Sequence, residues 1–274
     1  MDVVTYQGEA GAYSEAGAVA LFPEAEHQAL PSIRAVFESV EVGRARFGLV
    51  PMDNSQAGSI NETYDLFLRH GLHLVAETIV RVDHCLLALP GTSIDDVREV
   101  ISHPQAVAQS EEFLSALEVK VRAEYNTAGA AKHIAEERLE HTAAIASRRA
   151  AELYGLEILA EGIQTYPDNY TRFGTLSRDP SPLATPDKSS LVFGVGHVAG
   201  SLYRCLGALA ERHLNLTKLE SRPRPGRPWE YVFYADVEAA ADLPEMIEAL
   251  AELSKHATFT RLLGTYAGAA QRKP

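Results

Sequence analysis

Asn169 to Phe173 is the stretch of this chain best suited to chemistry, because it places a hydroxyl and a guanidinium side by side. It follows Tyr166-Pro167-Asp168, a sequence typical of a turn. Two polar segments accompany it, Asp53-Asn54-Ser55 far upstream and Glu220-Ser221-Arg222-Pro223 downstream. Hydroxyls and an arginine can bind the carboxylates of a small organic acid, and this is the chemistry we expect.

Other common kinds of site find no support in the sequence. Gly8 and Gly11 do not have the G-x-G-x-x-G spacing of a dinucleotide site, and there is no Walker loop. The ten histidines show no H-E-x-x-H or comparable metal spacing. The G-x-S-x-G elbow of serine hydrolases does not occur. We therefore expect neither a cofactor nor a metal.

Composition and charge narrow the class of protein. The chain has 274 residues, 46% hydrophobic and 23% charged, which is ordinary for a soluble globular protein. Its net charge of −12 disfavours nucleic acid and anionic membranes as partners, because both require clustered positive charge. Cys85 and Cys205 are far apart in apolar contexts, which predicts reduced, packed cysteines. No apolar run approaches the ~18 residues of a membrane span. The segment Met1 to Tyr6 lacks a basic region and a signal core, so we expect a cytoplasmic protein.

Short apolar strands alternate with helices along the first part of the chain. Their periodicity predicts strands at 3–6, 47–50, 100–102, 120–125, 143–146 and 156–160. Ile33, Val36, Phe37 and Val40 have helical spacing. Thr127, Ser147 and Asp242 are candidate caps of later helices. This order predicts an α/β fold with a mostly parallel sheet and covered faces.

Polar segments occupy the ends of several predicted strands. In parallel α/β sheets, ligands bind at the carboxyl ends of strands, often on helix N-termini. If these segments converge, their pocket suits a small, multiply anionic organic acid. The segments are Gly8 to Ser14, Asp53 to Ser59, Ser102 to Gln105, and Tyr170 to Phe173.

The pattern changes in the last third of the chain. Asp179 to Lys188 contains three prolines and is typical of a linker or domain edge. The elements expected beyond it follow the order β-α-β-β-α-β within about 80 residues, the ferredoxin-like pattern. A second, smaller domain is therefore predicted.

Several segments of the chain match one known family, in that family's order. They are Tyr6-Gln7-Gly8 through Tyr13-Ser14, Val50 to Ser55 with Gly58 to Thr63, His103-Pro104-Gln105-Ala106, Ala144 to Ser147, Asn169 to Phe173, Gly200-Ser201-Leu202, and Glu220 to Pro223. Through these segments the chain resembles, over nearly its full length, monofunctional prephenate dehydratases with a C-terminal ACT regulatory domain.

The resemblance implies a fold and a reaction. The catalytic domain, residues 1–180, would be bilobed like type 2 periplasmic binding proteins, with lobes at roughly 1–76 plus 163–180, and 77–162. The ACT domain would span 189–270. The reaction would convert prephenate to phenylpyruvate in phenylalanine biosynthesis. Phenylalanine would bind the ACT domain as an allosteric ligand at a homodimer interface, in a dimer or a dimer of dimers.

The resemblance also implies roles for individual residues. In the family, the threonine matching Thr171 is regarded as essential, and we expect it to hydrogen-bond the departing oxygen. The expected catalytic residues are Thr171, Asn54, Asp53 and Glu62. The expected substrate-binding residues are Ser14, Ser55, Gln105, Arg172 and Phe173. The expected phenylalanine-binding residues are Gly200, Ser201, Leu202, Glu220, Ser221 and Arg222.

Two positions depart from the family pattern. The family usually has glutamate where this chain has Asp53, which makes Glu62 a second candidate for the acid. The regulatory loop, roughly Asn-Lys-Pro-Gly-Ala-Leu in the family, is His197 to Leu202 here, and only its glycine and leucine match.

Three alternatives remain open from the sequence. An arogenate dehydratase would carry out the same elimination on the amino analogue. A non-catalytic sensor would bind an organic acid without turnover. The ACT-like part could also serve dimerisation alone.

Overall fold

The computed structural model describes residues 2–224 and 230–269. These residues divide into two compact units, each described here by itself. The first comprises Met1–Thr63 and Ile79–Phe173, and the second Tyr64–Thr78 and Gly174–Pro274. Residue 270, the predicted end of the second domain, lies outside the described residues.

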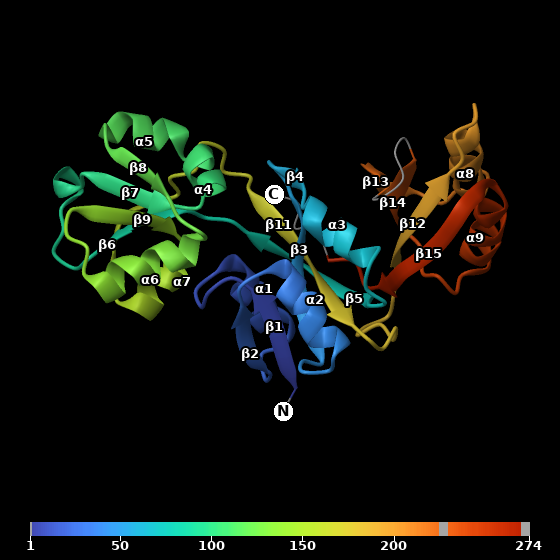
Figure 1. Ribbon diagram of the computed structural model, residues 1–274, viewed down its shortest axis with the longest axis horizontal. Coiled ribbons are helices and arrows are strands. Elements are labelled where there is room, and N and C mark those ends of the chain that lie inside the picture. The colour runs from blue at the N-terminus through green and yellow to red at the C-terminus, as the bar shows by residue number, and fades with distance from the viewer. Residues whose placement is uncertain (1, 225–229, 270–274) are drawn as a thin grey trace. The chain divides into compact units, whose positions relative to one another are not determined.

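The first sheet has the strand order β2-β1-β3-β11-β5, with the short β4 paired to β3. β1 is parallel to both β2 and β3, and α1 and α2 pack against these strands (Figure 1). The bounds are β1 Val3–Gln7, α1 Tyr13–Leu21, β2 Glu26–Leu30, α2 Ile33–Glu41, β3 Phe47–Asn54, β4 Gly58–Ser59, α3 Asn61–Phe67, β5 His73–Arg81 and β11 Tyr170–Ser177.

Helix α2 shows how the sequence sets these elements. Ser32 caps it by accepting a hydrogen bond from the Ala35 backbone N–H at 3.1 Å. Its apolar residues at helical spacing are all buried, which confirms the predicted face: Ile33, Val36, Phe37 and Val40.

The second sheet has the order β10-β6-β9-β7-β8. β7 is parallel to β8 and β9. β6 runs antiparallel to both of its neighbours, so the predicted mostly parallel sheet is confirmed for β9-β7-β8 and not for the two pairs that β6 makes. The bounds are β6 Cys85–Ala88, η1 Ile94–Asp96, β7 Glu99–Ser102, α4 Pro104–Gln109, α5 Glu111–Leu117, β8 Lys120–Ala123, α6 Thr127–Glu137, β9 Thr142–Ala146, α7 Arg148–Tyr154 and β10 Glu157–Glu161.

Helix caps in this sheet only partly follow the prediction. Ser147 caps α7, as expected, by accepting from the Ala150 N–H at 3.1 Å. Thr127 does not cap α6, because Asn126 precedes it and accepts from the Gly129 N–H. An asparagine at this position is as favourable a cap as threonine, and it displaces the boundary by one residue.

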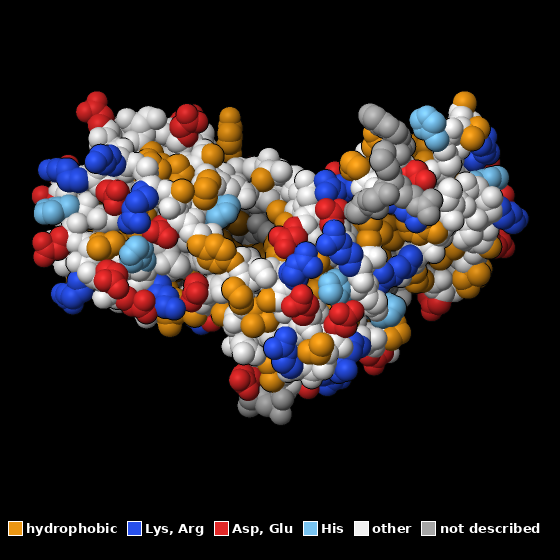
Figure 2. Space-filling model, in the orientation of Figure 1, with side chains coloured by type: hydrophobic (Ala, Val, Ile, Leu, Met, Phe, Trp, Pro, Cys, Tyr) orange, Lys and Arg blue, Asp and Glu red, His pale blue; other side chains and the backbone are white. Residues whose placement is uncertain are grey.

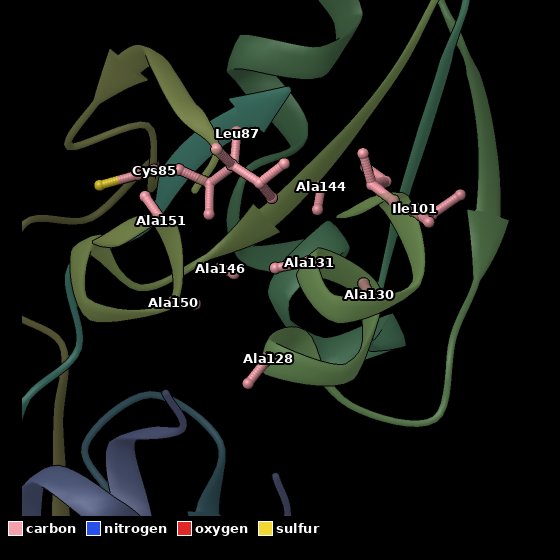
Figure 3. Close-up of a cluster of buried hydrophobic side chains, with 12 residues drawn as sticks. Cys85, Leu87, Ile101, Ala128, Ala130, Ala131, Ala144, Ala146, Ala150 and Ala151 are labelled. Atoms are coloured by element: carbon pink, nitrogen blue, oxygen red, sulfur yellow. The ribbon is translucent and has the colours of Figure 1, made fainter. Parts of the chain in front are cut away.

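A cluster of small side chains packs α6 and α7 on the second sheet (Figure 3). Alanine has no side-chain atoms beyond Cβ, so the helix axes approach the strands closely and with little loss of side-chain entropy. The fully or nearly fully buried members are Cys85, Leu87, Ile101, Ala128, Ala130, Ala131, Ile134, Ala144, Ala146, Ala150, Ala151 and Leu156.

The loop that precedes α1 packs directly on α7, and we call this the inter-sheet contact. Gly11 has φ +88°, and a Cβ there would lie 2.9 Å from the Ala150 Cα, so only glycine fits. The Ser147 hydroxyl donates to the Gly11 carbonyl at 2.6 Å. Arg149 forms a two-pronged ion pair with Glu15, at 3.0 and 3.3 Å. The two sheets of the first unit are thereby tied together.

The second unit contains a four-stranded sheet of order β13-β14-β12-β15 with antiparallel pairing. Helices α8 and α9 bury Cys205, Leu209, Met246 and Leu253 against it. The bounds are β12 Lys188–Val195, α8 Ser201–Ala210, β13 Leu216–Pro223, β14 Tyr231–Val237, α9 Pro244–His256 and β15 Ala257–Tyr266. The predicted β-α-β-β-α-β order is confirmed. Asp242 does not cap α9, since Leu243 occupies the cap position and makes no side-chain bond.

Candidate functional site

A cleft of about 490 Å³ lies within the first unit, lined by residues from both of its sheets. It collects segments that are far apart in the sequence, as the strand-end positions predicted. Six of the expected site residues line it: Ser14, Asn54, Glu62, Gln105, Thr171 and Phe173.

Helix N-termini surround this cleft. The first turns of α1, α2, α3, α4 and α6 all contribute lining residues. Among the described lining residues there is no lysine or arginine, and Glu62 is the one carboxylate. Attraction for an anion therefore comes from helix dipoles and backbone N–H groups.

Asn54 and Thr171 meet at the floor of the cleft. Both are buried, at 6% and 9% exposure. The Asn54 side-chain Nδ2 donates to Thr171 Oγ1 at 3.1 Å. Its Oδ1 accepts from the backbone N–H groups of Gln56 and Ala57, at 3.1 and 2.9 Å, which fixes the amide orientation. Since Thr171 Oγ1 accepts from the amide, its own proton can be donated into the cleft.

Asp53 and Arg172 do not line the cleft, contrary to the roles expected for them. They neighbour Asn54 and Thr171 in sequence, but side chains alternate faces along a strand. Arg172 Nη1 donates to Asp53 Oδ2 at 3.0 Å, and Asp53 Oδ1 accepts from the Ser59 hydroxyl at 3.0 Å. The structure therefore places this pair in an ion-pair network away from the described cleft lining.

Ser55 and Ser14 have structural partners. Ser55 Oγ accepts from the Tyr170 N–H at 2.9 Å and donates to the Asp168 carbonyl at 3.1 Å, and it is not among the cleft-lining residues. Ser14 does line the cleft, but its hydroxyl donates to the Gln7 carbonyl at 2.5 Å. An oxygen lone pair of Ser14 is thus what this side chain offers to a ligand.

Tyr13, His84 and Gln109 line the cleft as well, although none of them was among the expected site residues. Gln109 could have been found, because it follows Gln105 by one helical turn on α4. Tyr13 and His84 lie 71 positions apart, and their contact is not readable from spacing.

Burial favours the uncharged form of the two histidines that line the cleft, His84 and His103. Burial lowers the pKa of His84, against a smaller opposing effect of its hydrogen bond to Gln109. Burial also lowers the pKa of His103, whose Nδ1 accepts from the Gln105 N–H at 3.2 Å. Neither imidazole therefore supplies a permanent positive charge near pH 7.

The cleft combines anion-directed helix ends with a fixed hydroxyl donor. A family model described as "Prephenate dehydratase" matches residues 4–181, and one described as "ACT domain" matches residues 189–255. The chain belongs to the prephenate dehydratase family. It is an enzyme, a carbon–oxygen lyase, with a mixed α/β catalytic part and a C-terminal ACT domain.

Named relatives show the range of this family. The chain is 45% identical to "Arogenate dehydratase 5, chloroplastic" of Arabidopsis thaliana, over 96% of this chain and 67% of that protein. A solved prephenate dehydratase of Arthrobacter aurescens in complex with L-Phe is 29% identical, with TM-score 0.90, covering 99% and 92% of the two chains. A solved structure described as "a novel type of quorum quenching acylases" is 34% identical, with TM-score 0.90, covering 99% and 100%.

The ACT domain lies in the second unit and contains the loop that was expected to bind phenylalanine. Gly200, Ser201 and Leu202 line a cavity of about 530 Å³ formed by Val195 to Tyr203. Gly200 has φ +81° and precedes α8, a conformation that favours glycine. The loop thus presents a helix N-terminus and backbone groups beside its apolar residues.

The other expected phenylalanine-binding residues lie on β13 and do not line this cavity. Ser221 is exposed, while Glu220 and Arg222 are partly buried on the alternate positions. Arg222 Nη2 donates to Asp65 Oδ2 at 2.8 Å within the second unit. Within one copy, the structure therefore does not bring the two regulatory segments into one cavity.

No described helix is long and apolar enough to cross a membrane. Within residues 2–224 and 230–269, no three histidine, cysteine or acidic side chains are grouped so that they could hold a metal ion. On the face shown in Figure 2, lysine and arginine side chains are interspersed with acidic ones.

Proposed function

We propose that this chain converts prephenate to phenylpyruvate, carbon dioxide and water in L-phenylalanine biosynthesis. The observation that carries the proposal is the Thr171 hydroxyl, held by the Asn54 amide at 3.1 Å in a cleft ringed by helix N-termini. This arrangement suits a substrate with two carboxylates and one hydroxyl leaving group. The helix ends bind the carboxylates, and the hydroxyl donor faces the departing oxygen.

The reaction needs little more than this from the protein. The ring carboxylate leaves as carbon dioxide, its electron pair enters the ring, and the ring hydroxyl leaves. One proton joins the leaving oxygen, so the prephenate dianion yields phenylpyruvate, carbon dioxide and water. Thr171 stabilises the negative charge that develops on this oxygen, and the net proton comes from water or from Glu62. Aromatisation supplies the driving force. Phe173 provides an apolar wall for the ring.

Incubation of the purified chain with prephenate near neutral pH tests the proposal. Phenylpyruvate, followed by its absorbance in alkali, should accumulate far above the buffer blank. Binding of prephenate without turnover would instead support the sensor alternative.

Arogenate is the second candidate substrate, and Glu62 favours it. Arogenate has an ammonium group where prephenate has a keto group, and a carboxylate in a cleft without lysine or arginine lining suits such a cation. A comparison of kcat/KM for the two substrates decides between them. If Glu62 binds the ammonium group, Glu62→Gln should lower kcat/KM for arogenate more than for prephenate.

Acyl transfer is less well supported by the geometry. An acylase hydroxyl must be activated by an adjacent base. Among the described contacts, the Ser14 hydroxyl donates to a backbone carbonyl and Thr171 Oγ1 accepts from an amide. A lactone or amide substrate therefore meets a hydrogen-bond donor in this cleft, without an activated nucleophile. Release of a carboxylic acid from an N-acylated test substrate would instead favour acyl transfer.

Phenylalanine is the proposed allosteric ligand, acting at the ACT domain of a homo-oligomer. The loop cavity around Gly200 supports this, as does the bound L-Phe of the Arthrobacter aurescens relative. Titration with phenylalanine should change the rate of phenylpyruvate formation. Sedimentation in the same solutions reports the oligomer, and a change in sedimentation without a change in rate would leave dimerisation as the domain's role.

The domain limits 1–180 and 189–270 are proposed on the sequence and supported by the spans of the two family matches. The compact units divide differently, since Tyr64–Thr78 groups with Gly174–Pro274. Limited proteolysis should cut between residues 181 and 188 if the linker proposal is correct. The cytoplasm is the proposed compartment, supported by two buried free thiols that suit reducing conditions, and cell fractionation tests it.

A further inference from the structure

We propose that His84 is a positioning residue for the Thr171 hydroxyl: its Nε2–H holds the Gln109 amide, Gln109 holds Asn169, and Asn169 supports the Asn54 amide that contacts Thr171. The effect on catalysis rests on the proposed function, whereas the protonation of His84 does not. The backbone fixes the amide orientation of Asn54.

Asn54 cannot be turned around. Its Oδ1 accepts from two backbone N–H groups, those of Gln56 and Ala57. A reversed amide would place a donor against these two donors. Nδ2 must therefore point toward Asn169 Oδ1, at 2.8 Å, and Thr171 Oγ1, at 3.1 Å.

This orientation determines every amide beyond it. Because Asn169 Oδ1 accepts from Asn54, its Nδ2 is the atom that donates to Gln109 Oε1, at 3.0 Å. Gln109 Oε1 also lies 3.0 Å from His84 Nε2. Oε1 is an acceptor, so His84 Nε2 must carry a hydrogen. The donor order thus runs from the backbone near Asn54 to the imidazole.

The other ring nitrogen completes the assignment. His84 Nδ1 lies 3.2 Å from the Tyr13 hydroxyl, which donates to the Asp83 carbonyl at 2.7 Å. His84 is 2% exposed, and burial favours its uncharged form. The neutral ring with hydrogen on Nε2 is the form that can donate to Gln109, the first of the three linked amides Gln109, Asn169 and Asn54.

Loss of this hydrogen would release Gln109. The Gln109 Nε2 is buried and has no hydrogen-bond partner among the described residues. Two donors, from His84 and Asn169, hold Oε1 in its present orientation. If the imidazole Nε2 carried no hydrogen, the Gln109 amide would rotate so that its own Nε2–H donates to the ring. The same rotation would place this N–H against the Asn169 Nδ2–H, which is also a donor. Displacement of Asn169 would then cost the Asn54 amide the acceptor at 2.8 Å that holds it beside Thr171.

Nitrogen chemical shifts of the full-length protein test the assignment directly. In protein labelled with ¹⁵N-histidine near pH 7.5, the His84 signals are identified by their absence in His84→Gln. We expect a pyrrole-type, protonated Nε2 and a pyridine-type, bare Nδ1. A protonated Nδ1 with a bare Nε2 would overturn the proposal, whatever the enzyme's activity.

Kinetics of two substitutions test the positioning role. Glutamine can place an N–H near the Nε2 position, whereas asparagine is too short to reach it. We expect His84→Asn to lower kcat about tenfold to a hundredfold, the effect of leaving a buried polar chain unsatisfied, with KM changed less than about threefold. His84→Gln should keep kcat within about threefold of the wild type.

The comparison separates the possible failures. Equal loss in both variants, with wild-type unfolding curves, would show that the Nε2 donor has no special role and overturn the proposal. A rise in KM alone would also contradict it, since positioning of Thr171 acts on the reacting complex. If the wild type turns over neither prephenate nor arogenate, the proposed function fails, while the nitrogen shifts still decide the state of His84.

Discussion

The two faces of the strand pair β3 and β11 carry different chemistry from adjacent residues. On one face, Asn54 and Thr171 form a neutral amide–hydroxyl pair in the cleft. On the other, Asp53 and Arg172 form an ion pair joined by Ser59. Adjacent residues of each strand thus place a hydroxyl and an amide on one face and an ion pair on the other.

Under the proposed function, this difference explains how the cleft would bind an anion without an arginine. The helix ends would hold the carboxylates, and the neutral Thr171 hydroxyl would act on the charge that develops on the departing oxygen. The ion pair on the opposite face fixes the two strands with respect to each other. The charged face therefore supports the geometry on which the neutral face depends.

The largest effect is expected from removal of the Thr171 hydroxyl on the cleft face. Thr171→Ala should lower kcat by about 10²- to 10³-fold, the usual effect of losing one donor to a developing negative charge, with little change in KM. Thr171→Ser retains the hydroxyl and is the matched control. Steady-state rates with the better of the two substrates give the answer, and near-wild-type kcat in the alanine variant would remove Thr171 from the mechanism.

Removing the arginine should affect stability instead. Arg172→Met leaves the partly buried Asp53 carboxylate without this partner, and we expect a loss of about 1–3 kcal/mol in the free energy of unfolding with KM changed only a few-fold. Asp53→Asn, alone and combined with Arg172→Met, completes a double-mutant cycle that measures the coupling. A hundredfold rise in KM would show that Arg172 binds the substrate after all.

Adjacent residues of β13 also differ in burial, because Ser221 is exposed and Arg222 is partly buried. Arg222→Ala removes the ion pair with Asp65 and should lower the free energy of unfolding by about 1 kcal/mol or less, because both side chains are partly exposed. Ser221→Ala should leave stability unchanged and alter the phenylalanine concentration needed for half of its effect. Urea unfolding and phenylalanine titration of both variants separate the two faces, and identical behaviour of the variants would contradict the alternation.

The smallest expected effect is on the pH dependence of stability. Burial lowers the folded-state pKa of His84 and His103, so below about pH 6.5 the unfolded chain takes up these protons first. Stability should therefore fall as the pH drops below about 6.5, and His84→Gln should reduce that fall. Urea unfolding at pH 7.5 and 5.5 measures it. Arg172→Met, on the charged face, is the control and should keep the wild-type pH dependence.

Regular patterns in the sequence predicted much of the fold. The helical spacing of α2 depends on burial of one face, and such periodicity is visible locally. Strand β2 was missed because Glu26 to Leu30 is polar and partly exposed at the edge of its sheet. The reversed direction of β6 depends on how the chain crosses between two sheets, which local pattern does not report.

The candidate site was predicted in its location more than in its details. The strand-end rule located Asn54, Thr171 and Gln105 correctly at the cleft. It did not separate the faces of β11, although the two-residue period of a strand could have excluded Arg172 from the side of Thr171. The amide chain ending at His84 joins residues up to 117 positions apart, and only the folded structure reveals it.

The inter-sheet contact has a consequence for any widening of the cleft. A rotation that widened the cleft on the side of α1 would have to separate Gly11 from Ala150 and break the two-pronged pair of Glu15 with Arg149. These contacts fail together or not at all, because they lie on one short loop and one helix. Under the proposed function, any widening of the cleft on the side of α1 during turnover would thus have to break all of these contacts at once.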